Sequence, residues 1–165
     1  MKNNVQVIMN EKFWIVEIFK KKEAFDVFGK EIKKNIKELG ILNVEKVRVS
    51  NLYKIITDAG KKNIVKIARD LLVDNISEDF KVYRKFKKIK NFWIVEVFFK
   101  EGVTDSVGET AKKTIIESGI LKKLEVKTGK KYYIKGNLKE KEVKEICEKL
   151  LANTLIQNYF IYPKG

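Results

Sequence analysis

The pentapeptide FWIVE occurs twice in the 165-residue chain, at residues 13–17 and again at residues 92–96. Segments 13–83 and 92–162 align without a gap, and about a third of the 71 aligned positions are identical. Because a solenoid needs about three or more repeats, two copies indicate tandem duplication of a complete small unit. The sequence therefore predicts an N-terminal extension at 1–12, a repeat at 13–83, a basic linker at 84–91 and a second repeat at 92–162.

Each repeat carries the pattern of a β-α-β-β-α-β unit. The FWIVE segment alternates like a strand, and the next segment has apolar residues at helical spacing before Gly40, a position typical of a helix end. The segments VEKVRVS and NLYKIIT predict two short strands, and DFKVY or NYFIY predicts the last one. Between them lies the clearest helix of each repeat, with apolar residues at i, i+3, i+4, i+7 and i+8, namely Ile64, Ile67, Ala68, Leu71, Leu72 and Val143, Ile146, Cys147, Leu150, Leu151. The fold class expected is α+β.

The first strand of each repeat is apolar on both faces. Trp14 and Trp93 alternate with Phe13, Ile15, Phe92 and Ile94, so they point to the opposite side of the strand. One face is expected to meet the helices, and the other a second sheet, either that of the sister repeat or that of another chain. We therefore expect the two repeats to pair as an intramolecular pseudo-dimer.

The residue inventory narrows the chemistry that the chain can perform. It has no histidine and a single cysteine, Cys147, which excludes zinc sites of the usual kinds, Ser-His-Asp and Cys-His catalysis, and an internal disulfide. The one cysteine fits a reducing cytoplasm. The N-terminus lacks the apolar core of a signal peptide, and no apolar run reaches the roughly 18 residues of a membrane span. We expect a cytoplasmic protein with no membrane segment and no metal site.

A net charge of +14 is compatible with nucleic-acid binding through phosphate contacts. The positive charge is almost entirely lysine, however, with arginine only at positions 48, 69 and 84. Arginine is the better bidentate reader of phosphate and guanine, and lysine excess also accompanies biased nucleotide composition or heat adaptation. A nucleic-acid partner is therefore not the favoured interpretation.

The second repeat carries motifs that resemble the PurS subunit of phosphoribosylformylglycinamidine (FGAM) synthase, an enzyme of purine biosynthesis. The stretches are GKKYYI and CEKLLANTLIQNY, of which LLAN is the most specific, and the resemblance covers essentially all of residues 92–162. The matching positions are Asp105, Gly108, Gly129, Lys130, Cys147, Leu150, Leu151, Ala152 and Asn153, ending at Tyr159. The first repeat is more diverged and has Val73-Asp74-Asn75 where the second has Ala152-Asn153-Thr154. It looks more like the start of the large single-chain form of the synthetase.

The resemblance implies a tandem PurS that builds within one chain the dimer that single-unit PurS forms from two. It implies a noncatalytic subunit that bridges the synthetase subunit PurL and the glutaminase subunit PurQ and helps ammonia transfer between them. The complex would use ATP, magnesium and glutamine, with no cofactor held by this chain. Whether pseudo-dimers associate further stays open.

Eight residues are candidate partner contacts, each with a structural alternative. Asp26 and Asp105 are placed to cap helices, with Gly108 in the first turn of one of them. Gly129 suits a turn with positive φ, and Lys130 suits a solvated position. Tyr53 and Tyr132 are expected to pack, and Asn153 is expected to form a left-handed helix end. Cys147 lies on an apolar stripe, where a buried inert thiol is expected.

Two other classes of protein are compatible with this pattern. A tandem ligand-sensing module of the ACT type also pairs βαββαβ units, but it needs a glycine turn after the first strand, and the first repeat has Glu23 where the second has Gly102. A nucleic-acid-binding protein needs exposed aromatic residues between the lysines of one sheet face, for which the linker around Phe86 offers only a weak version.

Overall fold

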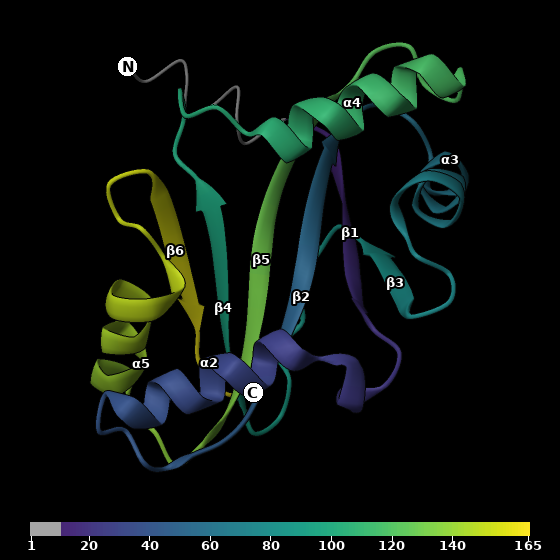
Figure 1. Ribbon diagram of the computed structural model, residues 1–165. Coiled ribbons are helices and arrows are strands. Elements are labelled where there is room, and N and C mark those ends of the chain that lie inside the picture. Colours follow the sequence, from purple (N-terminus) through teal and green to yellow (C-terminus); the bar gives the residue numbers. More distant parts are fainter. Residues whose placement is uncertain (1–10) are drawn as a thin grey trace.

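The structure is a computed structural model and describes residues 11–165; most of the expected extension at 1–12 lies outside the described residues. The described residues form one six-stranded sheet in the order β3-β1-β2-β5-β4-β6 (Figure 1). Every neighbouring pair is antiparallel. The strands are β1 (Phe13–Lys20), β2 (Val44–Ile56), β3 (Glu78–Tyr83), β4 (Phe92–Phe99), β5 (Glu125–Gly136) and β6 (Gln157–Tyr162). The two repeats thus join edge to edge through β2 and β5, so the α+β class and the intramolecular pseudo-dimer are confirmed.

The two short middle strands expected in each repeat are continuous in the structure. Within β2, residues 44–50 pair with β5 alone, whereas residues 51–56 pair with both β5 and β1. No proline interrupts this run, so the backbone stays extended past Ser50. The predicted boundary between the two short strands corresponds to the point in β2 at which pairing with β1 begins.

Within residues 11–165, four α-helices cover one face of the sheet: α2 (Val27–Glu38), α3 (Lys61–Ile67), α4 (Ser106–Ser118) and α5 (Glu140–Ile146). Both α3 and α5 continue into a π-helical turn, η2 (Ala68–Leu72) and η3 (Cys147–Leu151). The i to i+5 bonds are Val73 N to Ala68 O at 3.0 Å and Ala152 N to Cys147 O at 2.9 Å. Because both repeats keep this turn, it belongs to the repeated unit.

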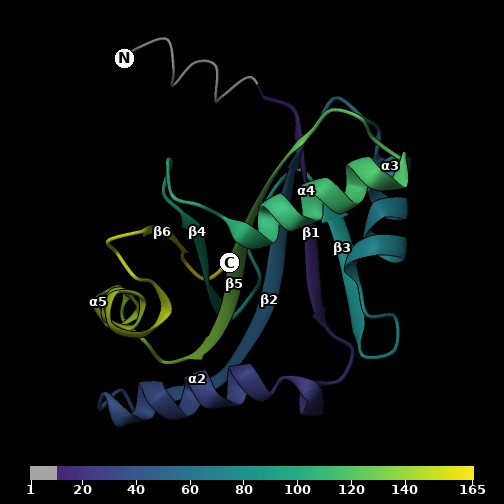
Figure 2. The same ribbon diagram turned by 45° about the horizontal axis from the view of Figure 1, so that its top comes forward.

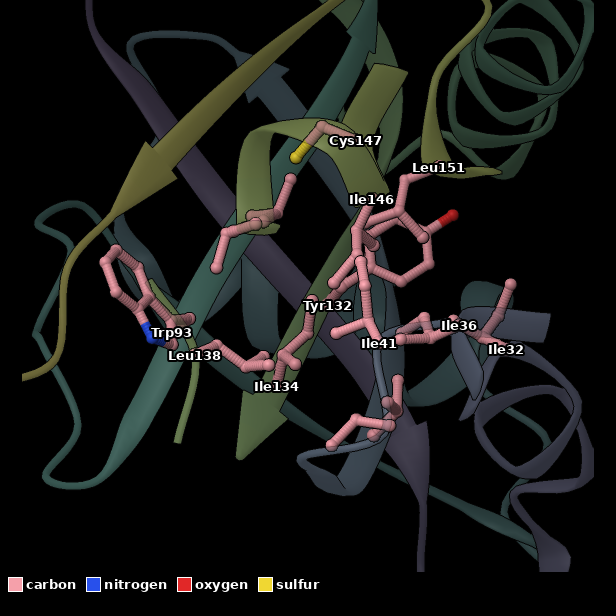
Figure 3. Close-up of a cluster of buried hydrophobic side chains, with 14 of the residues drawn as sticks. Ile32, Ile36, Ile41, Trp93, Tyr132, Ile134, Leu138, Ile146, Cys147 and Leu151 are labelled. Carbon is pink, nitrogen blue, oxygen red and sulfur yellow. The ribbon is translucent and has the colours of Figure 1, made fainter. Parts of the chain in front are cut away.

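The first helix of each repeat packs into the core of the other repeat. Ile32 and Ile36 of α2 lie in one buried cluster with Trp93, Val95 and Ile146 of the second repeat (Figure 3). Reciprocally, α4 contributes Ala111 and Ile115 to a cluster whose other members include Val16, Ile64 and Ile67 of the first repeat. Both views place α2 near α5 and α4 near α3 (Figures 1 and 2). Each hydrophobic core is therefore built from both repeats.

The sheet face opposite the helices, which we call the open face, does not meet a second sheet formed by the sister repeat. That expectation is wrong, because the sister strands extend the same sheet instead. Within residues 11–165, the linker between β3 and β4 lies against this face. Phe86 stacks on Tyr162 with ring centroids 4.2 Å apart, and the Lys131 Nζ atom lies 4.6 Å from the centre of the Phe86 ring.

Candidate functional site

The two repeats meet on a pseudo-twofold axis that passes between Asn51 and Lys130. These two residues occupy equivalent repeat positions, 79 apart, and are also directly paired across β2 and β5. The Lys130 Nζ atom donates a hydrogen bond to Asn51 Oδ1 at 3.0 Å. A symmetric homodimer would place identical side chains opposite each other here. Tandem fusion instead lets one repeat supply an amide and the other an ammonium group.

A cleft of about 480 Å³ lies over this axis on the helix-covered face. Its lining includes four of the candidate residues, Tyr53, Gly129, Lys130 and Tyr132. Phe28 at the start of α2 and Val107 at the start of α4 are equivalent residues, and both line the cleft. Tyr132 is buried in a core cluster and Tyr53 packs against the other, so their predicted packing role is confirmed.

Burial dominates the electrostatics of this cleft. It lowers the pKa of Lys130, whose Nζ atom lies 5.1 Å from the centre of the Phe28 ring. It also raises the pKa of Tyr53, and that of Tyr132 to about 12. The Cys147 thiol is buried, as expected, and burial raises its pKa to about 12, which keeps it protonated and unreactive. The cleft thus offers one cation, neutral phenols and apolar walls, which suit binding.

Asp26 and Asp105 cap helices as predicted, and they also tie those helices to the central strands. Asp26 accepts hydrogen bonds from Gly29 N at 2.8 Å and from Val49 N at 3.1 Å. Asp105 accepts from Gly108 N at 2.9 Å and from both the backbone N (2.6 Å) and Oγ1 (2.7 Å) of Thr128. A Cβ atom on Gly108 would lie 2.6 Å from the Val126 carbonyl oxygen, so glycine permits this close helix–strand approach.

Gly129 does not form the predicted turn. It lies inside β5 with extended backbone, and the glycines with left-handed φ are Gly40, Gly102 and Gly119 within the described chain. The physical reason for glycine is crowding, because a Cβ atom would lie 2.5 Å from the Val97 carbonyl oxygen and 2.8 Å from the Phe98 ring. Gly40 does end α2 with φ of +92°, as its spacing predicted.

Asn153 does not adopt the left-handed helix end that its position predicted. Its side-chain Oδ1 accepts from Leu155 N at 3.1 Å, and its carbonyl accepts from Gln157 N at 2.8 Å. Asp74, the equivalent residue, accepts from Ile76 N and from Ser77 Oγ. Both residues therefore organise the turn that leads into the last strand. This turn lies outside the lining of the central cleft.

A buried ionic network on the open face was missed from the sequence. Glu17 is 2% exposed and Lys131 is 3% exposed. The Lys131 Nζ atom lies 3.5 Å from Glu17 Oε2 and 3.8 Å from Glu96 Oε1, so one cation serves the two equivalent carboxylates. Tyr83 donates to Glu17 at 2.8 Å, and Tyr133 also donates to it. The available signal was the repeated glutamate inside an otherwise apolar pentapeptide.

Between residues 11 and 165, no cluster of histidine, cysteine and carboxylate side chains has the arrangement of a metal site. In the same part of the chain, no helix has the length and hydropathy to cross a membrane.

These features define a class of protein: a tandem α+β module whose two repeats share one sheet and enclose a cleft on their pseudo-twofold axis. Comparison with known proteins identifies the family. The family model PurS, described as phosphoribosylformylglycinamidine (FGAM) synthase, matches residues 14–85 and again residues 93–163. The chain therefore belongs to the PurS family and is a tandem form of it. A curated relative, phosphoribosylformylglycinamidine synthase subunit PurS of Archaeoglobus fulgidus, is 39% identical over 72 residues, which are 41% of this chain and 90% of the relative.

Proposed function

We propose that this chain is a noncatalytic subunit of FGAM synthase that joins the synthetase subunit PurL to the glutaminase subunit PurQ and helps ammonia pass between them. The observation that carries the proposal is that both halves match the PurS family and together complete one two-unit sheet. The relative is one repeat long, so the tandem chain supplies two such units in fixed proportion.

The chemistry of the described residues supports a binding role in this complex. The cleft side chains that titrate are tyrosines with raised pKa and one lysine with lowered pKa, and no imidazole is available in the sequence. ATP, magnesium and glutamine would be used by the partner subunits, in the cytoplasm. The chain would contribute position and enclosure, and holding reacting groups in position lowers the barrier of the reaction between them.

Reconstitution tests this proposal. Purified synthetase and glutaminase subunits are assayed for FGAM formation with glutamine, and separately with ammonium salt, in the presence and absence of this chain. We expect omission of the chain to abolish most glutamine-dependent activity and to leave the ammonium-dependent activity of the synthetase. Equal loss of both activities would contradict a role in ammonia transfer, and full activity without the chain would contradict the bridging role.

One observation favours a second candidate function, binding of single-stranded nucleic acid. A groove of about 370 Å³ on the open face is lined by aromatic residues, including Phe13, Phe98 and Phe160, and by the cations Lys54, Arg84 and Lys127. Aromatic side chains between basic residues on a sheet face can stack bases and contact phosphates. Oligonucleotide binding that persists at about 0.3 M salt and weakens in Phe160→Ser would support this second function.

A further inference from the structure

We propose that the tandem chain binds one of its partner subunits on one side only, through an apolar patch at the start of α2 that takes an acidic, apolar protein surface. This inference rests on the proposed function and adds to it the place and chemistry of one contact. The patch consists of Phe25, Val27 and Phe28, which are 47%, 69% and 43% exposed. We call it the α2 patch.

The α2 patch has no counterpart in the second repeat. The equivalent residues, 79 positions later, are Thr104, Ser106 and Val107, so two of the three apolar side chains are replaced by hydroxyl residues. The backbone around these residues is the same in both repeats. Asp26 and Asp105 cap their helices, and each side chain accepts a hydrogen bond from the backbone N of the glycine three residues later. The difference therefore lies in the exposed side chains. Exposed large apolar residues that the fold does not need are typical of an interaction surface.

The net charge of the segment that carries the patch also differs between the repeats. Residues 20–38 contain seven lysines and four carboxylates, a net charge of +3. The equivalent residues 99–117 contain three lysines and four carboxylates, a net charge of −1. Two lysines contact the patch directly, with Lys22 Nζ 5.9 Å from the centre of the Phe25 ring and Lys130 Nζ 5.1 Å from that of Phe28. The patch thus lies on a segment of net positive charge, and one lysine from each repeat lies over its two rings.

Charge complementarity selects the occupant. A cationic surround favours a partner surface with carboxylates around an apolar side chain. A second copy of this chain would bring a like-charged patch and a net charge of +14, which opposes self-pairing at this site. A nucleic acid would satisfy the lysines and could stack its bases on Phe25 and Phe28, but it offers no aliphatic side chain to cover Val27, which is the most exposed of the three. A protein subunit is the occupant that matches both features.

The consequence is a fixed orientation. A symmetric homodimer presents every surface twice, so an asymmetric partner can bind it in two equivalent ways. In this chain the two sides that the pseudo-twofold axis relates are chemically distinct, and the partner finds one α2 patch for each two-repeat unit. Duplication followed by divergence would then set the stoichiometry at one copy of that partner for each chain.

The test exchanges the patch for the residues of the sister repeat. The triple variant Phe25→Thr, Val27→Ser and Phe28→Val is titrated against the purified PurL and PurQ subunits by calorimetry, beside the wild type and the control Leu155→Ser. Leu155 is also exposed and apolar but lies on a turn of the second repeat. We expect the triple variant to lose affinity for one subunit by about tenfold or more and to keep its affinity for the other. Leu155→Ser should bind both like the wild type.

Salt and folding controls complete the design. Wild-type affinity for the subunit in question should fall between 50 and about 300 mM salt, because the cations contribute to binding. If the triple variant unfolds, the single variant Val27→Ser is titrated in its place. This variant should fold, because the Val27 side chain is mostly exposed. A wild type that binds neither subunit overturns the proposed function and this inference together. If the wild type binds both subunits, and the triple variant and Val27→Ser bind them equally well, this inference alone is overturned. It is also overturned if the variants lose self-association or oligonucleotide binding and keep their affinity for both subunits.

Discussion

At the scale of single residues, duplication has allowed equivalent positions to take different roles. Lys131 is equivalent to Leu52, yet Lys131 is the buried cation between Glu17 and Glu96. Two copies of this lysine would place two cations in one small network, and two copies of leucine would leave both carboxylates without a cation there. One lysine for two glutamates also leaves the network short of positive charge. Burial correspondingly raises the pKa of Glu96, while Lys131 opposes that rise.

Replacement of Lys131 by methionine should therefore destabilise the protein strongly at neutral pH. Removal of one member of a buried ion pair costs about 3–5 kcal/mol, because the remaining charge stays buried. The folded-state pKa of Glu96 is raised, so its contribution to stability is full at low pH and is lost as pH rises through that pKa. Without Lys131 this pKa rises further. The loss of stability should be larger at pH 7 than at pH 5, as measured by urea unfolding.

The exposed Lys113, which forms a surface pair with Glu117, provides the matched control. Lys113→Met should change the free energy of unfolding by less than about 0.5 kcal/mol at either pH. An equal loss for Lys131→Met at both pH values would contradict the proposed coupling between the charge of Lys131 and the protonation of Glu96.

At the scale of helices and strands, the aspartate caps connect local and tertiary structure. Asp105 accepts three hydrogen bonds, two of them from Thr128 on β5, whereas Asp26 accepts two. Each cap therefore fixes both the start of a helix and its position on the central strands. This explains why aspartate with a glycine three residues later occurs in both repeats.

Asp105→Ala should destabilise the protein by about 1–2 kcal/mol, because the helix end and Thr128 both lose their acceptor. Asp26→Ala should cost less, since one hydrogen bond fewer is lost. Thermal unfolding followed by circular dichroism measures both, with the exposed Asp70→Ala as the control that should stay within about 0.5 kcal/mol. A larger effect for Asp26 than for Asp105 would contradict this ranking.

Elements determined by local sequence could be predicted, and those determined by tertiary pairing could not. The apolar spacing of α2 and α3, the aspartate caps and the end of α2 at Gly40 are all local features, and each is found. The continuity of β2 depends on pairing with β5, a strand of the other repeat, and the exchange of α2 and α4 between the cores has no local signal. Lys131 was missed because it lies in a run of lysines that look solvated in sequence.

At the scale of the whole molecule, the repeats visible in the sequence are not the units of packing. Each core takes its first helix from one repeat and its last helix from the other. The linker reinforces this arrangement, because Phe86 contacts Tyr162 of the second repeat and lies over Lys131. Separation of the two halves would expose both cores. The chain is therefore expected to unfold as one cooperative unit despite its duplicated sequence.

The two tryptophans allow this expectation to be measured core by core. Trp14 packs against the cluster that contains Val16 and Ile64, and Trp93 lies in the cluster that contains Ile36 and Ile146. Trp14→Phe leaves Trp93 as reporter of one core, and Trp93→Phe leaves Trp14 as reporter of the other. Within each variant, tryptophan fluorescence and far-ultraviolet circular dichroism should give the same midpoint in urea, because each core contains a helix from both repeats and neither repeat can unfold without disrupting both cores. Comparison of two signals within one variant removes any effect of the substitution on overall stability.

A fluorescence midpoint that precedes the dichroism midpoint in one variant and not in the other would mean that the cores unfold separately. The exchanged helices would then contribute little to the stability of this fold.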